Sequence, residues 1–413
     1  MSASRRQFLH GLGLMGLGGC ACCLARRAPA AVLDTRVEPL IGSNYQPQDT
    51  DERGIWQSCE RIEDSIRHSD RLMRSAAMQD YTAGVMERLL GRPVTDLRIY
   101  LMHDASFNAA MFPTGMMIVH TGFMVRARNE AQFAAVLGHE AGHYFRKHTL
   151  QQYRSMRRKA AAAAVLSVGA GIAAGVAGPY DASWWDVAAG INLALVLSMF
   201  QYSRDMESEA DAFGIALMSK AGYRPGSASE VWRQLIDERK LSAQYRKKRY
   251  RDSSDSVVST HPPSEERMHD LADTAEHLRN EGSEAKFDGV SEWQAVTSPL
   301  LPRMLDEQVK RNDPGASLYL IQSLARSGWT GQLHYQHGET FRMRGLPEDD
   351  DKAAAAYAAA VQLADAPPEA WRAHGYALLK TGRTPEGREA LTRYLALQPD
   401  ARDAAMVRFT LAQ

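Results

Sequence analysis

Cysteine and net charge are both scarce in this chain of 413 residues. Three of its four cysteines lie near the amino end, at Cys20, Cys22 and Cys23. Removal of residues 1–30, which we expect below, would leave Cys59 alone, as a small core residue on a helix. An internal disulfide and a metal site made of cysteines are then excluded by number. The 49 basic residues balance the 49 acidic ones, so the composition predicts no binding of nucleic acid.

The amino end has the form of an export signal. Residues 4–9 read Ser-Arg-Arg-Gln-Phe-Leu, which is typical of a twin-arginine signal, and the apolar run behind them is too short to span a membrane comfortably. A small-x-small cleavage site ends at Ala30, and an alternative lipoprotein site would acylate Cys20. We therefore expect a signal peptide at residues 1–30, a linker at residues 31–50 and a periplasmic protein, which acylation would attach to a membrane.

The most informative stretch is His-Glu-Ala-Gly-His at residues 139–143. Two histidines four apart on a helix point the same way, so His139 and His143 can bind one metal ion. Glu140 is rotated round the helix and can reach a water on that metal without being a ligand. Asn129 is the expected N-cap, and Glu140 falls within an apolar stripe where a carboxylate needs a cation or donor nearby. The pattern predicts a zinc hydrolase site.

A third zinc ligand is expected from a second helix, since a catalytic zinc has three protein ligands and a position for water. The best source is the acidic stretch at residues 202–214, where Glu207 and Asp211 share a helix face. We assign Glu207 as the ligand and Asp211 as the acceptor that orients a ligand histidine. Arg204 is one turn earlier and could pair with a carboxylate or with the developing oxyanion. Glu209 is the alternative ligand.

These motifs together resemble the zinc metalloendopeptidases related to the HtpX heat-shock protease and the CAAX prenyl proteases. That family has an R-x-x-E-x-x-A-D pattern, an Asn-Ala pair followed by Pro and Gly, and a later T-H-P-x-x-x-x-R segment. The matching residues are Arg204, Glu207, Ala210, Asp211, Asn108, Ala109, Pro113, Gly115, Thr260, His261, Pro262 and Arg267. The resemblance covers about residues 50–275 and is closest to a periplasmic branch with a tetratricopeptide tail. It implies misfolded or incompletely assembled envelope proteins as substrates.

Two strands are predicted upstream of the zinc helix, at Leu97–Met102 and Met116–Val119, with a loop at Asn108–Gly115 between them. A substrate backbone can add to an edge strand beside the zinc helix, so peptides would be bound with little side-chain preference. Asn108 and Ala109 are the expected substrate-binding residues.

Two apolar runs follow the zinc helix, at residues 160–178 and Val187–Phe200. Alanine and glycine provide little transfer free energy, so we expect a soluble helical hairpin beside the active site. One alternative is a hairpin that dips into the membrane with Trp184 and Trp185 at the interface, and another is a lid over the cleft.

Histidines outside the pair need separate interpretation. His261 lies in a Thr-His-Pro-Pro loop and could donate to the oxyanion, or it could occupy the open zinc position until substrate arrives. The alternative interpretation is that His261 is a surface or turn histidine without a catalytic role. His103, His120 and His148 are expected to be structural, because each lies off the assigned metal face.

The sequence pattern near the carboxyl end predicts a separate helical module. Three residues recur after one constant interval, namely Gly338, Gly345 and Tyr357 as Gly375, Gly382 and Tyr394. Such tetratricopeptide-like hairpins stack into a concave surface that binds peptides or partner proteins, and a plain helical bundle is the alternative. The expected fold is α+β and mainly helical, with a zincin-like metallopeptidase domain and small β-sheet before the repeat module. The predicted ranges are 51–275 for the peptidase, 276–312 for a connector and 313–413 for the module.

The predicted activity is that of a zinc-dependent metalloendopeptidase with one Zn²⁺ per chain. The zinc would activate a water molecule, and Glu140 would take its proton and pass it to the leaving amine. Arg204 or His261 would stabilise the oxyanion. Two alternatives stay open: a chaperone-like assembly or scaffold factor whose helical tail binds clients, and a zinc hydrolase of non-peptide amides.

Overall fold

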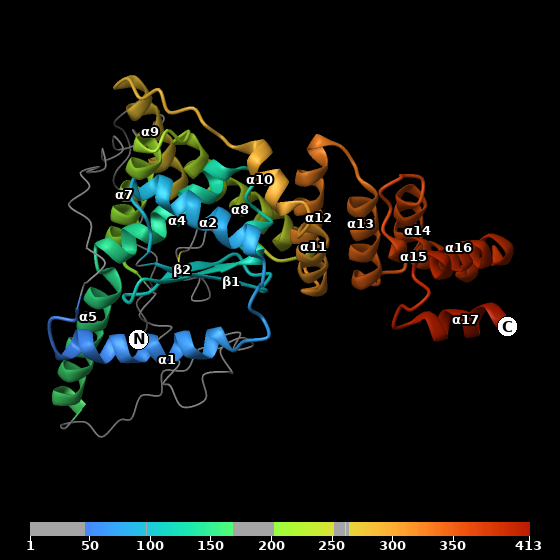
Figure 1. Ribbon diagram of the computed structural model, residues 1–413, viewed down its shortest axis with the longest axis horizontal. Helices are drawn as coiled ribbons and strands as arrows, with labels where there is room; N and C mark the ends of the chain where they lie inside the picture. Colours follow the sequence, from blue (N-terminus) through green and yellow to red (C-terminus); the bar gives the residue numbers. More distant parts are fainter. Residues whose placement is uncertain (1–45, 96, 168–201, 252–260, 262–263) are drawn as a thin grey trace, which may run out of the picture. The chain divides into compact units, whose positions relative to one another are not determined.

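The computed structural model describes residues 46–95, 97–167, 202–251, 261 and 264–413 (Figure 1). The predicted signal peptide with Cys20 lies outside the described residues, as does most of the predicted linker. Residues 168–201, which include most of the predicted apolar hairpin, lie outside them as well, so the three placements of that hairpin stay predictions. No helix within the described part of the chain is long and apolar enough to cross a membrane.

A three-stranded sheet lies next to the helix that carries the histidine pair. The strands are β1 (Arg98–Met102), β2 (Ala109–Met111) and β3 (Met116–His120), in the order β1-β3-β2. β1 is parallel to β3, and β2 is antiparallel to it. The two predicted strands are present, but the segment predicted as a loop contains β2. This strand is only three residues long and buried throughout, so it shows no alternation that a sequence could reveal.

Apolar side chains cover both faces of the sheet. Met117 and Val119 face the main core, whereas Met116 and Ile118 face a second core under α1 (Thr50–Arg67). The alternation follows the pleat of β3, because successive side chains point to opposite faces. In Figure 1 the sheet accordingly lies between α1 on one side and helices α2 and α4 on the other. Cys59 is buried in the second core, as predicted for a core residue on a helix.

Apart from the sheet and α1, the described part of the predicted peptidase region consists mainly of helices. They are α2 (Ala76–Leu90), α3 (Thr121–Met124), α4 (Glu130–Phe145), α5 (His148–Ser167), α7 (Arg204–Lys220), α8 (Gly226–Tyr245) and α9 (Glu265–Asn280). As predicted, Asn129 caps α4, and its side chain accepts a hydrogen bond from the backbone N–H of Gln132.

The close pairing of α4 with α7 depends on glycine. A Cβ added to Gly138 would lie 3.2 Å from the Cα of Gly214, and one added to Gly214 would lie 2.8 Å from the backbone nitrogen of His139. One turn further along α4, a Cβ on Gly142 would lie 2.9 Å from the Cα of Ala210. Small residues therefore let the two backbones approach closely at the level of the histidines, which brings side chains from both helices together.

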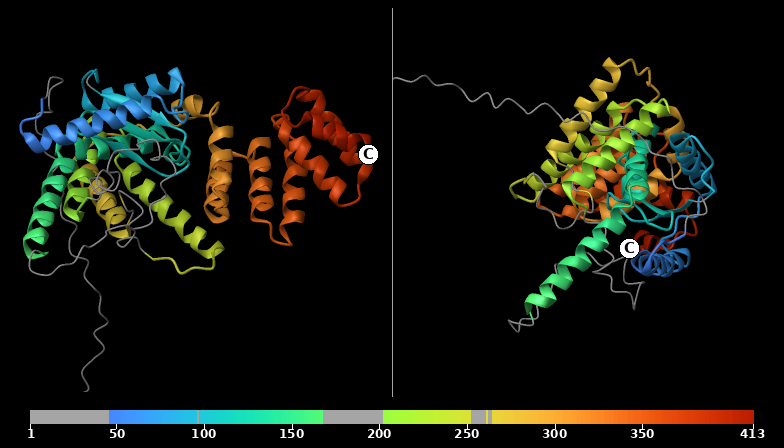
Figure 2. Two further views of the ribbon diagram at one scale, coloured as in Figure 1. Left: turned by 90° about the horizontal axis from the view of Figure 1, so that it is seen from below. Right: turned by 90° about the vertical axis from the view of Figure 1, so that its left-hand side faces the viewer.

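The remaining helices continue to the carboxyl end. They are α10 (Val290–Thr297), α11 (Leu301–Lys310), α12 (Pro314–Leu324), α13 (Gly331–Arg344), α14 (Asp349–Ala360), α15 (Pro368–Lys380), α16 (Thr384–Leu397) and α17 (Ala404–Ala412), with a short 3-10 turn after α12. Trp293 and Leu305, from the predicted connector, belong to the same hydrophobic cluster as α4. Helices α13 to α16 lie side by side in sequence order (Figure 2). The domain boundaries themselves stay predictions.

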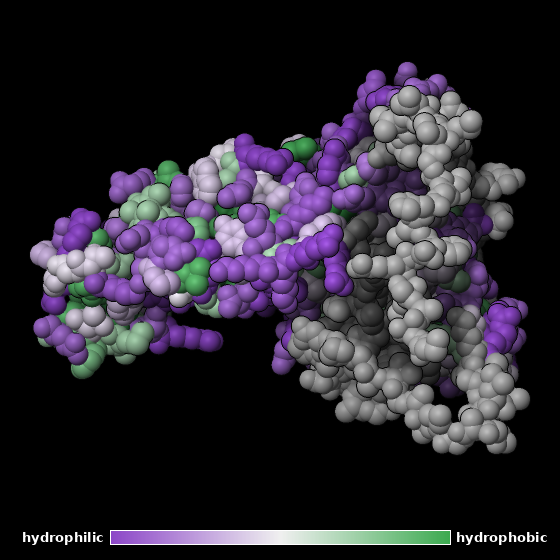
Figure 3. Space-filling view, turned by 180° about the vertical axis from the view of Figure 1, so that it is seen from behind, coloured by the Kyte–Doolittle hydropathy of each residue, from purple (hydrophilic) through white to green (hydrophobic). Residues whose placement is uncertain are grey.

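The architecture is mainly helical with one small sheet, as predicted for the fold class. On the face shown in Figure 3, hydrophilic residues dominate the described surface and apolar residues are scattered among them. Among the described residues, the most exposed large apolar side chains are Met406 and Phe409 on α17.

Candidate metal centre

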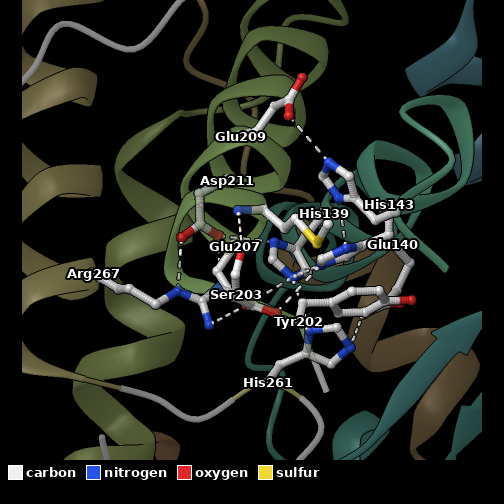
Figure 4. Close-up of polar contacts among 12 residues, drawn as sticks. His139, Glu140, His143, Tyr202, Ser203, Glu207, Glu209, Asp211, His261 and Arg267 are labelled. Atoms are coloured by element: carbon white, nitrogen blue, oxygen red, sulfur yellow. Dashed lines mark hydrogen bonds and ion pairs between the residues drawn. The ribbon is translucent and has the colours of Figure 1, made fainter. Parts of the chain in front are cut away.

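Four buried side chains converge beside the sheet. They are His139 and His143 from α4, Glu207 from α7 and His261 from the segment before α9 (Figure 4). Each offers one possible ligand atom, and these four atoms all lie within 4.8 Å of one another. The Nε2 atoms of His139 and His143 are 3.0 Å apart, and Nδ1 of His261 is 2.9 Å from Oε1 of Glu207. Histidine nitrogens and a carboxylate oxygen are among the usual ligand atoms of zinc in proteins.

The protonation of His139 can be deduced from its neighbour. Nδ1 of His139 lies 2.8 Å from Oδ1 of Asp211, a carboxylate that can only accept a hydrogen bond. Nδ1 therefore carries the hydrogen, and a neutral His139 presents the lone pair of Nε2 to the other three residues. A lone pair directed into a buried group of nitrogen and oxygen donors fits a cation. The residues present thus fit the predicted zinc ion, and the geometry brings Asp211 to the place predicted for it.

The electrostatics of the group also favour positive charge. Burial opposes charging of His139, but the carboxylates of Asp211 and Glu207 outweigh it and raise the pKa of His139 to about 9. Burial alone would raise the pKa of Glu207, yet the charges of Arg267 and His261 hold it well below its usual range. Glu207 is thus held in the ionised form that a metal ligand needs.

Arg267 is the residue that sequence reasoning missed as part of this site. It is buried on α9, donates to both oxygens of Asp211 at 2.8 Å, and lies 2.6 Å from Oε2 of Glu207 (Figure 4). Its guanidinium also lies over the ring of Trp232, at 4.4 Å from the ring centre. The family pattern includes this arginine, but no charge or spacing signal distinguishes it from exposed arginines. Its contacts show that it holds the two acidic side chains of α7 in place.

Arg204 is not brought to the site, which corrects the prediction that it stabilises the oxyanion. It is the first residue of α7, directly after the Ser203 cap, where the side chain extends into solvent. The side chain is 79% exposed and lies 3.8 Å from Glu266. The alternative ligand Glu209 is also absent from the group of four, because its carboxylate contacts His148 and Arg146 instead.

Glu140 lies beside the group without joining it. Its side chain is buried, and Oε1 lies 3.4 Å from Nε2 of His261. Burial is the largest influence on Glu140 and raises its pKa, which suits a group that must take up a proton. The backbone N–H of Met111 in β2 donates to the carboxylate and acts in the opposite direction. The proton acceptor is therefore linked directly to the edge strand of the sheet.

The expected substrate-binding residues lie on that edge strand. The carbonyl of Asn108 accepts a hydrogen bond from His120 at 3.1 Å, so its oxygen faces β3. Ala109 is the next residue, and the alternation of a strand turns its backbone groups away from β3. Within the described residues no strand pairs with this side of β2. The position suits addition of an extended peptide, and the role of both residues stays a prediction.

A mainly helical fold, a buried group of histidine and carboxylate donors, and an adjacent buried glutamate together define a zinc metallopeptidase domain. Comparison with known families assigns that class more narrowly. The model of Peptidase family M48 matches residues 73–275, so this segment is a peptidase domain of family M48. The resemblance predicted from the sequence is thereby confirmed, and zinc is confirmed as the cofactor expected for such a domain.

Individual relatives agree with that family. A putative beta-barrel assembly-enhancing protease of Vibrio cholerae is 26% identical over 216 residues, which are 51% of this chain and 42% of the relative. The beta-barrel assembly-enhancing protease of Escherichia coli is 24% identical over 257 residues, 60% of this chain and 50% of the relative. The mitochondrial metalloendopeptidase OMA1 of Schizosaccharomyces pombe is 28% identical over 158 residues, 38% of this chain and 43% of the relative. The chain spans about half the length of the curated relatives it matches.

Proposed function

We propose that this protein is a zinc-dependent metalloendopeptidase of the cell envelope that hydrolyses peptide bonds in misfolded or incompletely assembled envelope proteins. The observation that carries the proposal is the buried group of His139, His143, Glu207 and His261 with Glu140 beside it. Burying several ionisable side chains at one point is costly unless partners or an ion offset it, and a shared metal ion explains why these four converge.

The chemistry assigns one task to each residue. A zinc ion held by His139, His143 and Glu207 would polarise the scissile carbonyl and lower the pKa of a water molecule. Glu140 takes the proton of that water on its carboxylate and then delivers it to the nitrogen of the leaving amine. The edge strand β2, whose Met111 N–H contacts Glu140, aligns the substrate backbone next to this carboxylate. No covalent enzyme intermediate is needed.

His261 has an inhibitory role in this proposal. A catalytic zinc keeps one position open, but His261 brings a fourth donor into the same group. The histidine therefore competes with water, and its side chain must leave this position for catalysis. His261→Ala should then raise cleavage of a short unstructured peptide. A slower variant would instead support the other predicted role, donation to the oxyanion.

The substrate class rests on similarity, supported by the tail. The Vibrio cholerae and Escherichia coli relatives carry the name beta-barrel assembly-enhancing protease, which refers to beta-barrel assembly. The repeated glycines Gly338 and Gly375 each face a large side chain of the following helix, Tyr357 and Leu391. This supports a tetratricopeptide-like module that would bind client or partner proteins. The predicted twin-arginine signal supports a periplasmic location.

Digestion of unfolded protein tests the proposal. The purified mature chain should contain about one zinc ion and degrade casein, and a chelator should stop the reaction until zinc is restored. Glu140→Gln should retain zinc and lose about 10²- to 10⁴-fold in rate, the usual contribution of a general base. A protein without zinc that cleaves nothing would contradict the proposal. A Glu140→Gln variant with full function in cells would favour the scaffold alternative.

A further inference from the structure

The two histidines of α4 are held by different kinds of neighbour. Each must present an unprotonated Nε2 to a shared cation, which requires the hydrogen on Nδ1 and an acceptor for it. For His139 that acceptor is the carboxylate of Asp211 at 2.8 Å. For His143 the neighbour at Nδ1 is another imidazole, since Nδ1 of His148 lies 2.9 Å away. An imidazole can donate or accept, so it fixes the hydrogen only if its own state is fixed.

Glu209 fixes the state of His148. Nε2 of His148 lies 3.1 Å from Oε2 of Glu209, and a carboxylate only accepts, so this nitrogen carries the hydrogen. A neutral His148 then has a lone pair on Nδ1 and accepts from Nδ1–H of His143. The lone pair of His143 is consequently at Nε2, which lies 3.0 Å from Nε2 of His139. These polar contacts thus orient both lone pairs toward the same point.

The local fold keeps this chain of contacts together. Lys147 has a left-handed backbone with φ of 56°, and it joins the end of α4 to the start of α5, which returns His148 to the side of His143. The side chain of His148 is fully buried, whereas that of Glu209 is 46% exposed. Arg146 lies 3.1 Å from the second oxygen of Glu209 and fixes the carboxylate.

We propose that His148 and Glu209 are positioning residues that fix the Nδ1–H tautomer and the orientation of His143. The inference rests on the proposed zinc site but not on peptidase activity. The sequence suggested that His148 was structural and that Glu209 was an alternative ligand. The proposal gives both residues the same role. Neither residue touches the reacting atoms, so the effect should appear in metal affinity before it appears in catalysis.

Zinc affinity of the mature chain, measured by competition with a chromogenic chelator, tests this proposal. His148→Phe keeps a ring but removes the acceptor, and should weaken zinc binding about 10- to 100-fold, the usual effect of losing an outer partner. His148→Gln can accept from His143 and donate to Glu209, and should restore most of the affinity. Glu209→Gln should weaken binding less than His148→Phe. Asp205→Asn removes an exposed carboxylate from the first turn of the same helix and should change nothing.

Two further readouts separate positioning from a general structural role. The unfolding temperature of the zinc-free protein should be nearly equal for His148→Phe and His148→Gln. The visible spectrum of the cobalt-substituted protein should change in His148→Phe and return in His148→Gln, because it reports ligand geometry. Zinc affinity in His148→Phe equal to that of the unmodified chain would overturn the proposal, as would equal losses in both His148 variants. If the zinc affinities change as expected but the unmodified chain does not digest casein, the proposed function is contradicted and the positioning role of His148 and Glu209 is not.

Discussion

Among the described helices, the pair α4 and α7 and the pair α15 and α16 both use glycine for close approach, but they bring different kinds of side chain together. In α4 and α7, Gly138 and Gly214 let the backbones meet, and a Cβ on Gly214 would lie 2.8 Å from the nitrogen of His139. In α15 and α16, a Cβ on Gly375 would lie 3.0 Å from the carbonyl oxygen of Gly387. The packing geometry is similar in the two pairs, but the side chains that it brings together are not.

The first pair buries polar side chains beside its apolar ones, whereas the buried side chains of the second pair are mostly apolar. His139, Glu207 and Asp211 lie between α4 and α7, whereas Leu391 and Tyr394 are buried in the tail. Burial of apolar groups stabilises a fold directly, but burial of charged groups opposes folding unless their partners are well placed. The difference teaches that close approach in the tail builds a stack, while close approach in the peptidase domain sets ligand positions.

The sharpest test of this difference is Gly214→Ala. Alanine is the better helix former by about 1 kcal/mol, so any loss must come from the clash with the backbone of His139. We expect destabilisation of about 1–3 kcal/mol, the usual penalty of an overpacked contact, and zinc affinity lower by about 100-fold because His139 moves. Thermal unfolding and chelator competition measure the two effects. Gly84→Ala on α2, where nothing lies within 4 Å of the new Cβ, is the matched control and should be neutral or slightly stabilising.

The counterpart in the tail is Gly375→Ala. Its Cβ would lie 2.8 Å from Cγ of Leu391, a side chain that can adjust, as well as 3.0 Å from the carbonyl oxygen of Gly387. We expect the tail to lose about 1–2 kcal/mol of stability, with no change in zinc affinity or in cleavage of a short peptide. Limited proteolysis would detect the loosened tail. A loss of zinc in this variant would mean that the two pairs are coupled, and the contrast drawn above would fail.

The parts of the site that follow from local spacing could be predicted from the sequence. His139, His143 and Glu140 belong to one helical motif, and Glu207 with Asp211 repeats the same spacing on α7. A helix places residues four apart on one face whatever surrounds it, so these assignments needed only the two helices. The constant interval between Gly338 and Gly375 likewise needed only repeated hairpins.

The parts that depend on tertiary contacts could not be predicted in this way. Arg204 and Arg267 are both arginines near acidic residues in sequence, and only the packing of α9 against α7 decides which one is buried. The strand β2 exists because β3 pairs with it, and three buried residues have no pattern of their own. The left-handed backbone of Lys147 lets His148 face His143. A lysine at this position gives no sign in the sequence that the backbone turns in this way.

The buried carboxylate of Glu63 shows that a charge in the peptidase region can be stabilised by hydrogen bonds and ion pairs without a metal ion. Its substitution gives the smallest expected effect of these predictions. Glu63 on α1 accepts from Arg98 at 2.6 and 2.8 Å and from the hydroxyl of Tyr100 at 2.8 Å. Burial alone would raise its pKa, but these donors lower the pKa below the ordinary value of 4.5. The folded state therefore binds the proton less tightly than the unfolded state, so this contribution to stability is present above about pH 4.5 and is lost as the pH falls through the lowered pKa.

Glu63→Gln should accordingly reduce stability at neutral pH by about 2 kcal/mol, the typical worth of a hydrogen bond to a charged group. The gap to the unmodified chain should narrow as the pH falls below about 4.5, because Glu63 is then protonated in the unfolded chain first and in the folded chain only at lower pH. Urea unfolding with a chelator present throughout measures this without interference from the metal centre. Glu60→Gln, an exposed position on the same helix, is the control and should leave the pH dependence unchanged. A gap that stays constant down to about pH 3 would mean that Glu63 is held by packing, since the charge-dependent part of its contribution must disappear on protonation.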